Sequence, residues 1–268
     1  MKPSILLGAN KETPCVRQIY GVSGSGKTYF LSRMIRAAAK DKAFPPMWRF
    51  IIFDVKHEGY SGLVEKPFSN TADAVKSLKD NRVAVIHPPI EYSQQELDAL
   101  INWMFETSMR VEDFGATLIL EESSTFIRST VGGIPSSIKR LATQGRSLGL
   151  SMILANQRAL SNKWTDTQSS SITMFRLAVP DGEMMKKRWG LDNTAIDLKL
   201  SERQFSFAHY DLIDLSLSYF SPLDAPQPTK DKPLPPLKKK KPPYPKLDVG
   251  GVNENTFKRL FNWPEKIL

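Results

Sequence analysis

The sequence is poor in the residues that form disulfides and zinc sites. Its 268 residues include one cysteine, Cys15, and three histidines, His57, His87 and His209. A single cysteine excludes an intramolecular disulfide and fits a reducing compartment. The histidines are scattered and pair with no second cysteine, so we expect no zinc site. The fold must therefore be stabilised by an apolar core, and the chain is long enough to bury one.

Long apolar runs are also missing. No stretch of about 18 apolar residues, which a membrane-spanning helix requires, occurs in the sequence. The apolar run at the start of the chain is too short for a signal peptide. We therefore expect no integral membrane segment. The longest apolar runs, 116–120 and 150–155, have the length of buried strands.

The positive charge of the chain is unevenly distributed. The net charge is +9, yet residues 230–246 contain seven lysines and one aspartate, so this segment carries +6 and the remainder +3. Nine of the 19 prolines lie between residues 222 and 245. Such a composition cannot bury enough apolar surface to offset the entropy of ordering, so we expect an extended or disordered linker over 222–252. Its lysines favour a polyanionic partner, either nucleic acid or an anionic membrane surface, although a solubilising linker has the same composition.

The composition divides the chain into three parts. Residues 1–221 have the patterning of one α/β domain, and the Pro/Lys-rich tail follows it. Apolar residues return in 253–268, which predicts a short amphipathic anchor that docks on the body or on a neighbour.

Within the first part, strands alternate with helices. We expect strands at 16–20, 49–54, 82–86, 116–120 and 150–155. We expect helices at 28–40, 71–79, 93–109 and 136–145, the third of which opens with a capping box of Ser93 and Glu96. Two last segments, 172–178 and 204–220, have mixed strand character. This alternation predicts right-handed βαβ units and a mostly parallel central sheet flanked by helices.

A phosphate-binding loop lies between the first strand and the first helix. Residues 21–28 read Gly-Val-Ser-Gly-Ser-Gly-Lys-Thr, the P-loop pattern in the strand–loop–helix context that the motif requires. The glycines let backbone amides point at phosphate oxygens, Lys27 reaches the β- and γ-phosphates, and the Thr28 hydroxyl ligates Mg²⁺. The sequence thus predicts a P-loop NTPase that uses ATP and Mg²⁺. The nucleotide-binding residues that we expect are Gly21, Val22, Ser23, Gly24, Ser25, Gly26, Lys27, Thr28 and Tyr29.

Hydrolysis also requires groups that hold the metal and orient the attacking water. Glu121 and Glu122 directly follow a buried strand, and ligands of open α/β sheets gather at the carboxyl ends of strands. Because successive strand residues point to opposite sides, we expect Glu121 to face Mg²⁺ through water and Glu122 to polarise the water. An acidic start to the following turn is the alternative. Asp54 ends another strand and is a further candidate for the metal shell, or else a loop-capping aspartate.

Two further motifs carry a family resemblance. Residues 144–158, Gln-Gly-Arg-Ser-Leu-Gly-Leu-Ser-Met-Ile-Leu-Ala-Asn-Gln-Arg, resemble the FtsK/HerA superfamily of DNA-translocating ATPases, in which Gly-Arg-x-x-Gly precedes a strand ending in glutamine. Residues 54–60, Asp-Val-Lys-His-Glu-Gly-Tyr, look like the Asp-Pro-x-Gly-Glu-Tyr region of that group. With the phosphate loop and the acidic pair, the resemblance spans about residues 16–180. It implies a RecA-like P-loop fold of the additional-strand type.

The resemblance assigns further roles. Gln157 is implied to be the polar sensor that reads the γ-phosphate or the water. Arg146 is implied to be an arginine finger that reaches the next subunit's nucleotide, with Arg140 and Arg158 as alternatives, unless Arg146 pairs with a carboxylate of its own subunit. The usual acidic pair of the family is Asp-Glu, whereas this chain has Glu-Glu. Glu121 is one methylene longer than aspartate, so its water-mediated contact with the metal requires a slightly retracted strand end.

Within the superfamily, the size of the chain favours genome-packaging ATPases of internal-membrane phages and related double-stranded DNA viruses. The resemblance implies a homo-oligomeric ring, preferably a hexamer, that pulls double-stranded DNA without reading its sequence. It places the protein at a capsid or internal-membrane packaging vertex of the virion, and in the host cytoplasm. A DNA motor grips phosphates rather than bases. The segments 128–140, 158–170 and 186–189 are open candidates for that grip.

Other classes of protein also use a P-loop. A small-molecule kinase needs an arginine-rich lid, which residues 144–158 fit poorly. A morphogenesis or secretion ATPase that acts on protein at a membrane usually carries a membrane anchor. A nucleotide-gated scaffold, held by its lysine-rich tail, is the non-catalytic alternative.

Overall fold

The computed structural model describes residues 6–7, 16–57, 59–60, 62–127, 133–159, 162–202 and 204–221. All of these residues lie in one unit, Met1–Pro236. The predicted linker at 222–252 and the predicted anchor at 253–268 lie outside the described residues.

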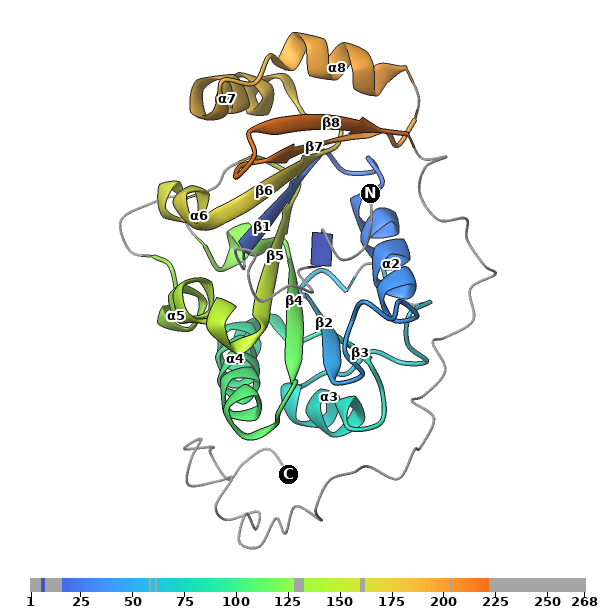
Figure 1. Ribbon diagram of the computed structural model, residues 1–268, viewed down its shortest axis with the longest axis vertical. Coiled ribbons are helices and arrows are strands. Elements are labelled where there is room, and N and C mark those ends of the chain that lie inside the picture. Colours follow the sequence, from blue (N-terminus) through green and yellow to red (C-terminus); the bar gives the residue numbers. More distant parts are fainter. Residues whose placement is uncertain are drawn as a thin grey trace, which may run out of the picture. The chain divides into compact units, whose positions relative to one another are not determined.

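One sheet of eight strands forms the centre of this unit (Figure 1). The strands are β1 Val16–Tyr20, β2 Trp48–Asp54, β3 Val83–Ile86, β4 Gly115–Glu121, β5 Leu150–Asn156, β6 Ser169–Met174, β7 Phe207–Asp211 and β8 Ser216–Phe220. The helices around it are α2 Lys27–Ala38, α3 Thr71–Leu78, α4 Ser93–Arg110, α5 Ser136–Gln144, α6 Lys163–Gln168, α7 Val179–Trp189 and α8 Asn193–Ser201. Short 3₁₀ turns occur at η1 Ile90–Tyr92, η2 Ser123–Thr125 and η3 Arg146–Leu148.

The strand order is β3-β2-β4-β5-β1-β6-β7-β8. The strands β3 to β6 of this order pair in parallel, whereas β7 pairs antiparallel with both β6 and β8. The loop-bearing strand β1 and the acidic strand β4 are not neighbours, because β5 lies between them. This is the additional-strand arrangement, so the predicted fold class is confirmed for the described residues.

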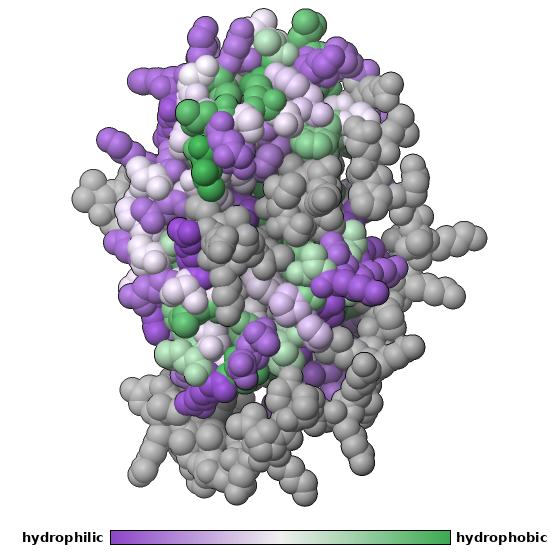
Figure 2. Space-filling model, viewed as in Figure 1, coloured by the Kyte–Doolittle hydropathy of each residue, from purple (hydrophilic) through white to green (hydrophobic). Residues whose placement is uncertain are grey.

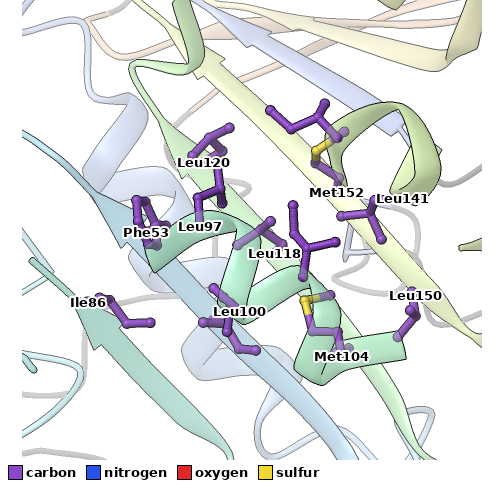
Figure 3. Packing of buried hydrophobic residues seen from close by; sticks show 14 of the residues in the cluster. Phe53, Ile86, Leu97, Leu100, Met104, Leu118, Leu120, Leu141, Leu150 and Met152 are labelled. Atoms are coloured by element: carbon purple, nitrogen blue, oxygen red, sulfur yellow. The ribbon is translucent and has the colours of Figure 1, made fainter. Parts of the chain in front are cut away.

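Helices cover both faces of the parallel part of the sheet, and the alternation of strand side chains decides which helix each residue meets. In β4, Leu118 and Leu120 pack in the cluster formed with α3, α4 and α5, whereas Ile119 packs in the cluster formed with α2. Figure 3 shows the first cluster, with Leu97, Leu100 and Met104 of α4 lying against the strands. Because both faces are buried, β2, β4 and β5 are buried along their whole length.

The C-terminal part of the sheet differs from the sequence prediction. The segment 204–220 forms not one strand but the hairpin of β7 and β8, and β6 begins three residues earlier than the predicted 172–178. Between them the chain forms α7 and α8, which pack on β6 and β7 in a third cluster. The irregular pattern of exposed and half-buried residues in β8 explains the ambiguity, because the strand has no buried residue.

The predicted capping box at the start of α4 does not form. Ser93 is already inside the helix, and its Oγ donates to the Ile90 carbonyl at 2.8 Å. Glu96 turns instead to α3, where its Oε2 accepts the Thr71 N–H at 2.7 Å. The motif is local, so a tertiary partner at the start of another helix replaces the local one.

Figure 2 shows one face of the molecule, on which polar side chains predominate and apolar ones gather toward the top, where Figure 1 places α7, α8 and β8. The exposed apolar residues of these elements and the β7–β8 turn are Val179, Leu198, Ile213, Leu215 and Tyr219. Among the helices of the described ranges, none combines the length and the apolar character needed to cross a membrane.

Candidate nucleotide-binding site

The phosphate loop connects the end of β1 to the start of α2. Gly24 and Gly26 have φ of 74° and 98°, a left-handed conformation that glycine adopts without steric cost. Gly21 has no room for a side chain, because a Cβ there would come within 2.7 Å of Phe175 Cβ and of Ser25 Oγ. The Val22 N–H donates to the Arg176 carbonyl at 2.9 Å and so ties the loop to the segment after β6. The glycines are therefore required by the path of this loop.

The first turn of α2 has backbone N–H groups without an acceptor inside the helix. Gly26 is the N-cap and has no side chain with which to cap them. Uncapped amides at a helix start, together with the helix dipole, favour an anion. Lys27 begins the helix and is buried, and its Nζ donates to the Gly21 carbonyl at 2.5 Å and to the Val22 carbonyl at 3.2 Å. Burial lowers the pKa of Lys27, an effect that the nearby Glu121 and Glu122 charges oppose.

Glu121 is the last residue of β4 and is buried. The Tyr60 hydroxyl donates a hydrogen bond to its Oε1. Burial raises the pKa of Glu121, and the hydrogen bond from Tyr60 opposes that rise. Burial, together with the Glu121 charge, raises the pKa of Tyr60 well above its usual value, so the phenol keeps its proton and remains a donor. Tyr60 thus fixes one oxygen of this carboxylate.

Glu122 does not follow the alternation expected of a strand. Its φ and ψ are 48° and 50°, a left-handed conformation that ends β4. Alternation holds only while the chain is extended, and the turn brings Glu122 to the same cavity as Glu121. The expectation that the two carboxylates point to opposite sides is therefore wrong. The Nζ of Lys56 lies 2.9 Å from Glu122 Oε1.

Asp54 ends β2 beside Glu121, because the two residues are paired in the parallel register of β2 and β4. It is buried, and its Oδ1 accepts the Lys56 N–H at 3.0 Å, as a loop-capping aspartate does. His87 Nε2 lies 3.5 Å from Asp54 Oδ2. Asp54 also lines the same cavity as Thr28, so capping the loop and facing the site are not exclusive.

The chain after Asp54 makes close contact with the phosphate loop. Gly59 has φ of 103°, and a Cβ on it would come within 2.6 Å of Thr28 Cγ2. His57 and Tyr60 also have positive φ, at 59° and 58°. Residues other than glycine rarely adopt this backbone conformation, and those that do are concentrated at functional sites. The strained turn places Tyr60 on Glu121 and Gly59 on Thr28.

Gln157 follows β5 and lines the cavity. The residue before it, Asn156, is buried and holds the turn after Glu122. Its Oδ1 accepts the Ser124 N–H at 2.8 Å, and its Nδ2 donates to Ser123 Oγ at 2.7 Å. The end of the inserted strand is thereby linked to the end of the acidic strand, so Asn156 positions Glu122.

These residues surround one cavity of about 300 Å³. Its walls are formed by Ser23, Gly24, Ser25, Gly26, Lys27, Thr28, Tyr29, Asp54, Lys56, Gly59, Glu121, Glu122 and Gln157. An uncapped helix start, a buried lysine and a glycine cradle fit a triphosphate. The hydroxyl of Thr28 and the carboxylates of Glu121 and Asp54 are the hard oxygen donors that Mg²⁺ prefers. The donor set therefore fits both ATP and Mg²⁺.

Of the predicted residues, Gly21 and Val22 support the loop through their carbonyls and do not line this cavity. Arg146 is likewise not part of its walls in the described ranges. Arg146 is exposed in η3, before β5, whereas Gln157 follows the other end of that strand. Seven strand residues span roughly 20 Å, so Arg146 lies at the opposite edge of the sheet.

The two alternative arginines have different surroundings. The Arg140 guanidinium lies 4.0 Å from the centre of the Phe105 ring. The side chain of Arg158 is 60% exposed, and its Nε is 3.7 Å from Asp181 Oδ1.

Lys56, Gly59, Tyr60 and Asn156 are site residues that the sequence patterns do not predict. The first three lie in the segment 54–60, which carries only the family resemblance. Its signal was a polar, glycine-containing stretch directly after a buried strand. Asn156 directly precedes the predicted sensor and gave no separate signal.

The predicted DNA-gripping segments remain three candidates. Segment 128–140 begins with residues outside the described ranges, and 158–170 contains α6. Segment 186–189 forms the last turn of α7, in which Lys186 and Lys187 are exposed. There, Arg188 Nη1 donates to Asp166 Oδ2 at 2.8 Å.

No protein-family model matches the chain, and a search of curated proteins finds no match. Solved structures do resemble it. The genome packaging NTPase B204 from Sulfolobus turreted icosahedral virus 2, in complex with ATP-γS, aligns with a TM-score of 0.59 at 18% identity, over 78% of this chain and 98% of that one. The DNA-packaging ATPase B204 from Sulfolobus turreted icosahedral virus aligns with a TM-score of 0.57 at 19% identity, over the same shares.

A third similar structure is the cytoplasmic domain of the type VII secretion ATPase EccC of Thermomonospora curvata. Its TM-score is 0.50 at 17% identity, and the match covers 77% of this chain and 25% of that one. At these identities the likeness concerns the fold. The chain has the P-loop NTPase fold of the additional-strand type expected from the FtsK/HerA resemblance, in the form seen in a viral genome-packaging NTPase.

Proposed function

We propose that the protein is an ATP-hydrolysing motor that translocates double-stranded DNA and packages a viral genome into a preformed capsid. The observation that carries the proposal is the convergence of Lys27, Thr28, Glu121, Glu122 and Gln157 on one cavity. Two structures of similar fold are a genome packaging NTPase and a DNA-packaging ATPase, which supports the choice of DNA as the load.

Each residue has a proposed task in hydrolysis. The loop amides and Lys27 would hold the phosphates. Thr28 and Glu121 would hold Mg²⁺, Glu121 through water, and the ion would neutralise charge on the phosphates. Glu122 accepts a proton from the attacking water, and Gln157 donates a hydrogen bond at the γ-phosphate or the water. Positioned general bases contribute about 10²- to 10⁴-fold to rate, so Glu122 carries a large share of the chemistry.

We further propose that the active form is a ring, preferably a hexamer, in which Arg146 reaches the nucleotide of the next subunit. Its position at the opposite edge of the sheet from the cavity supports action between subunits. An arginine finger contributes about 10³- to 10⁵-fold in other nucleotide hydrolases. Rings mixed from Arg146→Ala and Glu122→Gln subunits should then regain activity, because each variant supplies what its neighbour lacks. Full activity of rings made of Arg146→Ala alone would remove the finger from this position.

The test of the function is the rate of ATP hydrolysis with and without double-stranded DNA at several salt concentrations. We expect stimulation that is independent of DNA sequence and that falls steeply as salt rises, because phosphate contacts release counterions. Hydrolysis without any effect of DNA would point to an ATPase that acts on protein. Phosphate transfer to a nucleoside would identify a kinase. Deletion of residues 222–268 should leave nucleotide binding intact and abolish attachment at the packaging vertex. We place the protein in the host cytoplasm and at the packaging vertex of the virion.

A further inference from the structure

An exposed aromatic ring lies against the phosphate loop but has no part in the hydrolytic site. Phe205 precedes β7, and 43% of its surface is exposed. A Cβ on Gly26 would come within 2.9 Å of Phe205 Cδ1, so the ring edge rests on the backbone of Gly26. Gly26 also lines the cavity. The ring is therefore next to the place where the triphosphate is expected, with much of its surface open to solvent.

The backbone of Phe205 is in an unfavourable conformation. Its φ is 64°, in the left-handed region that bulky residues seldom occupy. Glycine or asparagine would adopt that conformation at lower cost. Burial of the ring does not explain the choice either, because Phe205 stays exposed. Strain of this kind persists mostly where a side chain has a task.

The walls of the cavity that the described residues form are mostly polar. Its walls are formed by glycines, serines and charged or amide side chains, and among the described residues that line it the one aromatic ring belongs to Tyr29. Tyr29 is engaged by Arg33, whose Nη1 donates to the Tyr29 hydroxyl at 3.0 Å and whose guanidinium lies 5.4 Å from the ring centre. A base attached to phosphates in this cavity therefore needs an apolar surface outside these walls, and Phe205 lies next to Gly26, which forms part of them.

We propose that the Phe205 ring is the stacking platform for the base of the bound nucleotide. This inference rests on the proposed nucleotide-dependent function and adds the residue that contacts the base. A phenyl ring offers a π-face and no hydrogen-bonding group. The stacking energy therefore depends on the area of the base and not on its identity. The stack accordingly favours purine over pyrimidine triphosphates and accepts GTP as well as ATP.

The test compares two ligands that share the phosphates and differ in the base. The equilibrium affinities of ATP and of inorganic tripolyphosphate, each with Mg²⁺, are measured for the unaltered full-length protein and for its Phe205→Gly variant. Glycine suits a φ of 64°, so this variant removes the ring without adding backbone strain. Base stacking on an aromatic ring is worth enough for roughly a tenfold loss of ATP affinity. Tripolyphosphate affinity should be unchanged, and Phe205→Trp should restore ATP binding.

Leu215 supplies the matched control. It has φ of 53°, is 70% exposed and lies in the turn at the other end of β7. Leu215→Gly relieves the same kind of strain and should leave both affinities unchanged. Equal ATP affinity in the full chain and Phe205→Gly overturns the inference while the proposed function stands. An equal loss of affinity for ATP and for tripolyphosphate also overturns the inference, because the ring would then only support the loop. Failure of the unaltered chain to bind either ligand overturns the proposed function, and this inference with it.

Discussion

Lys56 Nζ lies 2.9 Å from Glu122 Oε1, so the carboxylate proposed to activate water is already engaged by a cation. The two residues follow neighbouring strands, β2 and β4, whose parallel register aligns Asp54 with Glu121. The Lys56 side chain is 36% exposed and that of Glu122 is 15% exposed. Partly exposed pairs of this kind contribute about 0–1 kcal/mol. The pair therefore biases the position of Glu122 without locking it.

Removing this cation should raise hydrolysis in the absence of DNA. In Lys56→Met, Oε1 of Glu122 becomes available to the water, and a bias of at most about 1 kcal/mol corresponds to a rise of up to about fivefold. The measurement is the steady-state rate of the DNA-free protein. Lys76→Met breaks an exposed ion pair with Asp73 on α3 and should leave the rate unchanged. A large loss of activity in Lys56→Met would show instead that the lysine is needed for the reaction.

Gly59 should be intolerant of a side chain because of Thr28. Gly59→Ala combines a φ of 103° with a Cβ only 2.6 Å from Thr28 Cγ2, so the metal-binding hydroxyl must move. Gly190→Ala introduces a left-handed alanine at φ of 68° into open space. Gly190→Ala should lose about 1–2 kcal/mol of unfolding free energy, and Gly59→Ala at least as much. Only Gly59→Ala should lose affinity for Mg²⁺ and nucleotide in equilibrium binding. Similar binding losses in both variants would contradict this contact.

Asn156 should affect the rate more than nucleotide affinity. Asn156→Ala leaves the Ser124 N–H and the Ser123 hydroxyl without their partner, and the turn that carries Glu122 loosens. A small displacement of a reacting group can reduce the rate roughly ten- to a hundredfold. Steady-state kinetics should show a lower kcat with KM nearly unchanged. Asn70→Ala removes the N-cap of α3. It should cost about 1 kcal/mol of stability, with no change in kcat.

His209 should make the stability of the fold depend on pH. It is buried on β7, its Nδ1 lies 3.0 Å from Thr173 Oγ1, and burial lowers its pKa to about 4. The unfolded chain has the usual histidine pKa of about 6.5, so between these values the unfolded state binds more protons. The free energy of unfolding should therefore fall as pH drops from about 6.5 to about 4. Denaturant titrations of His209→Gln should show a flatter decline, and equal slopes would contradict this assignment.

The sequence is sufficient to predict the parallel part of the fold because that part follows local rules. Strands such as 116–120 and 150–155 are uninterrupted apolar runs, as sheets covered on both faces require. The phosphate loop is one contiguous motif. The hairpin of β7 and β8 was not separated, because β8 is exposed along an edge and lacks a regular apolar face. The capping box does not form because the Glu96 carboxylate accepts a hydrogen bond from the Thr71 N–H, 25 residues away.

Within the site, the sequence identifies chemistry but not contacts made across the sheet. Glu121 and Glu122 were predictable as an acidic pair after a strand. Their individual partners, Tyr60 and Lys56, depend on a turn whose backbone has positive φ, which no periodicity reveals. Asn156 acts through the strand inserted between β4 and β1, so its role depends on strand order.

Hydrolysis by the Glu122→Gln variant tests the central claim most directly. Glutamine keeps the size of the side chain but cannot accept a proton from water, so the rate of ATP hydrolysis should fall about 10²- to 10⁴-fold. Nucleotide affinity, measured on the same preparation, should be retained, because the phosphates are held by the loop and Lys27. A variant that binds ATP and hydrolyses it at the rate of the unaltered protein would contradict the account.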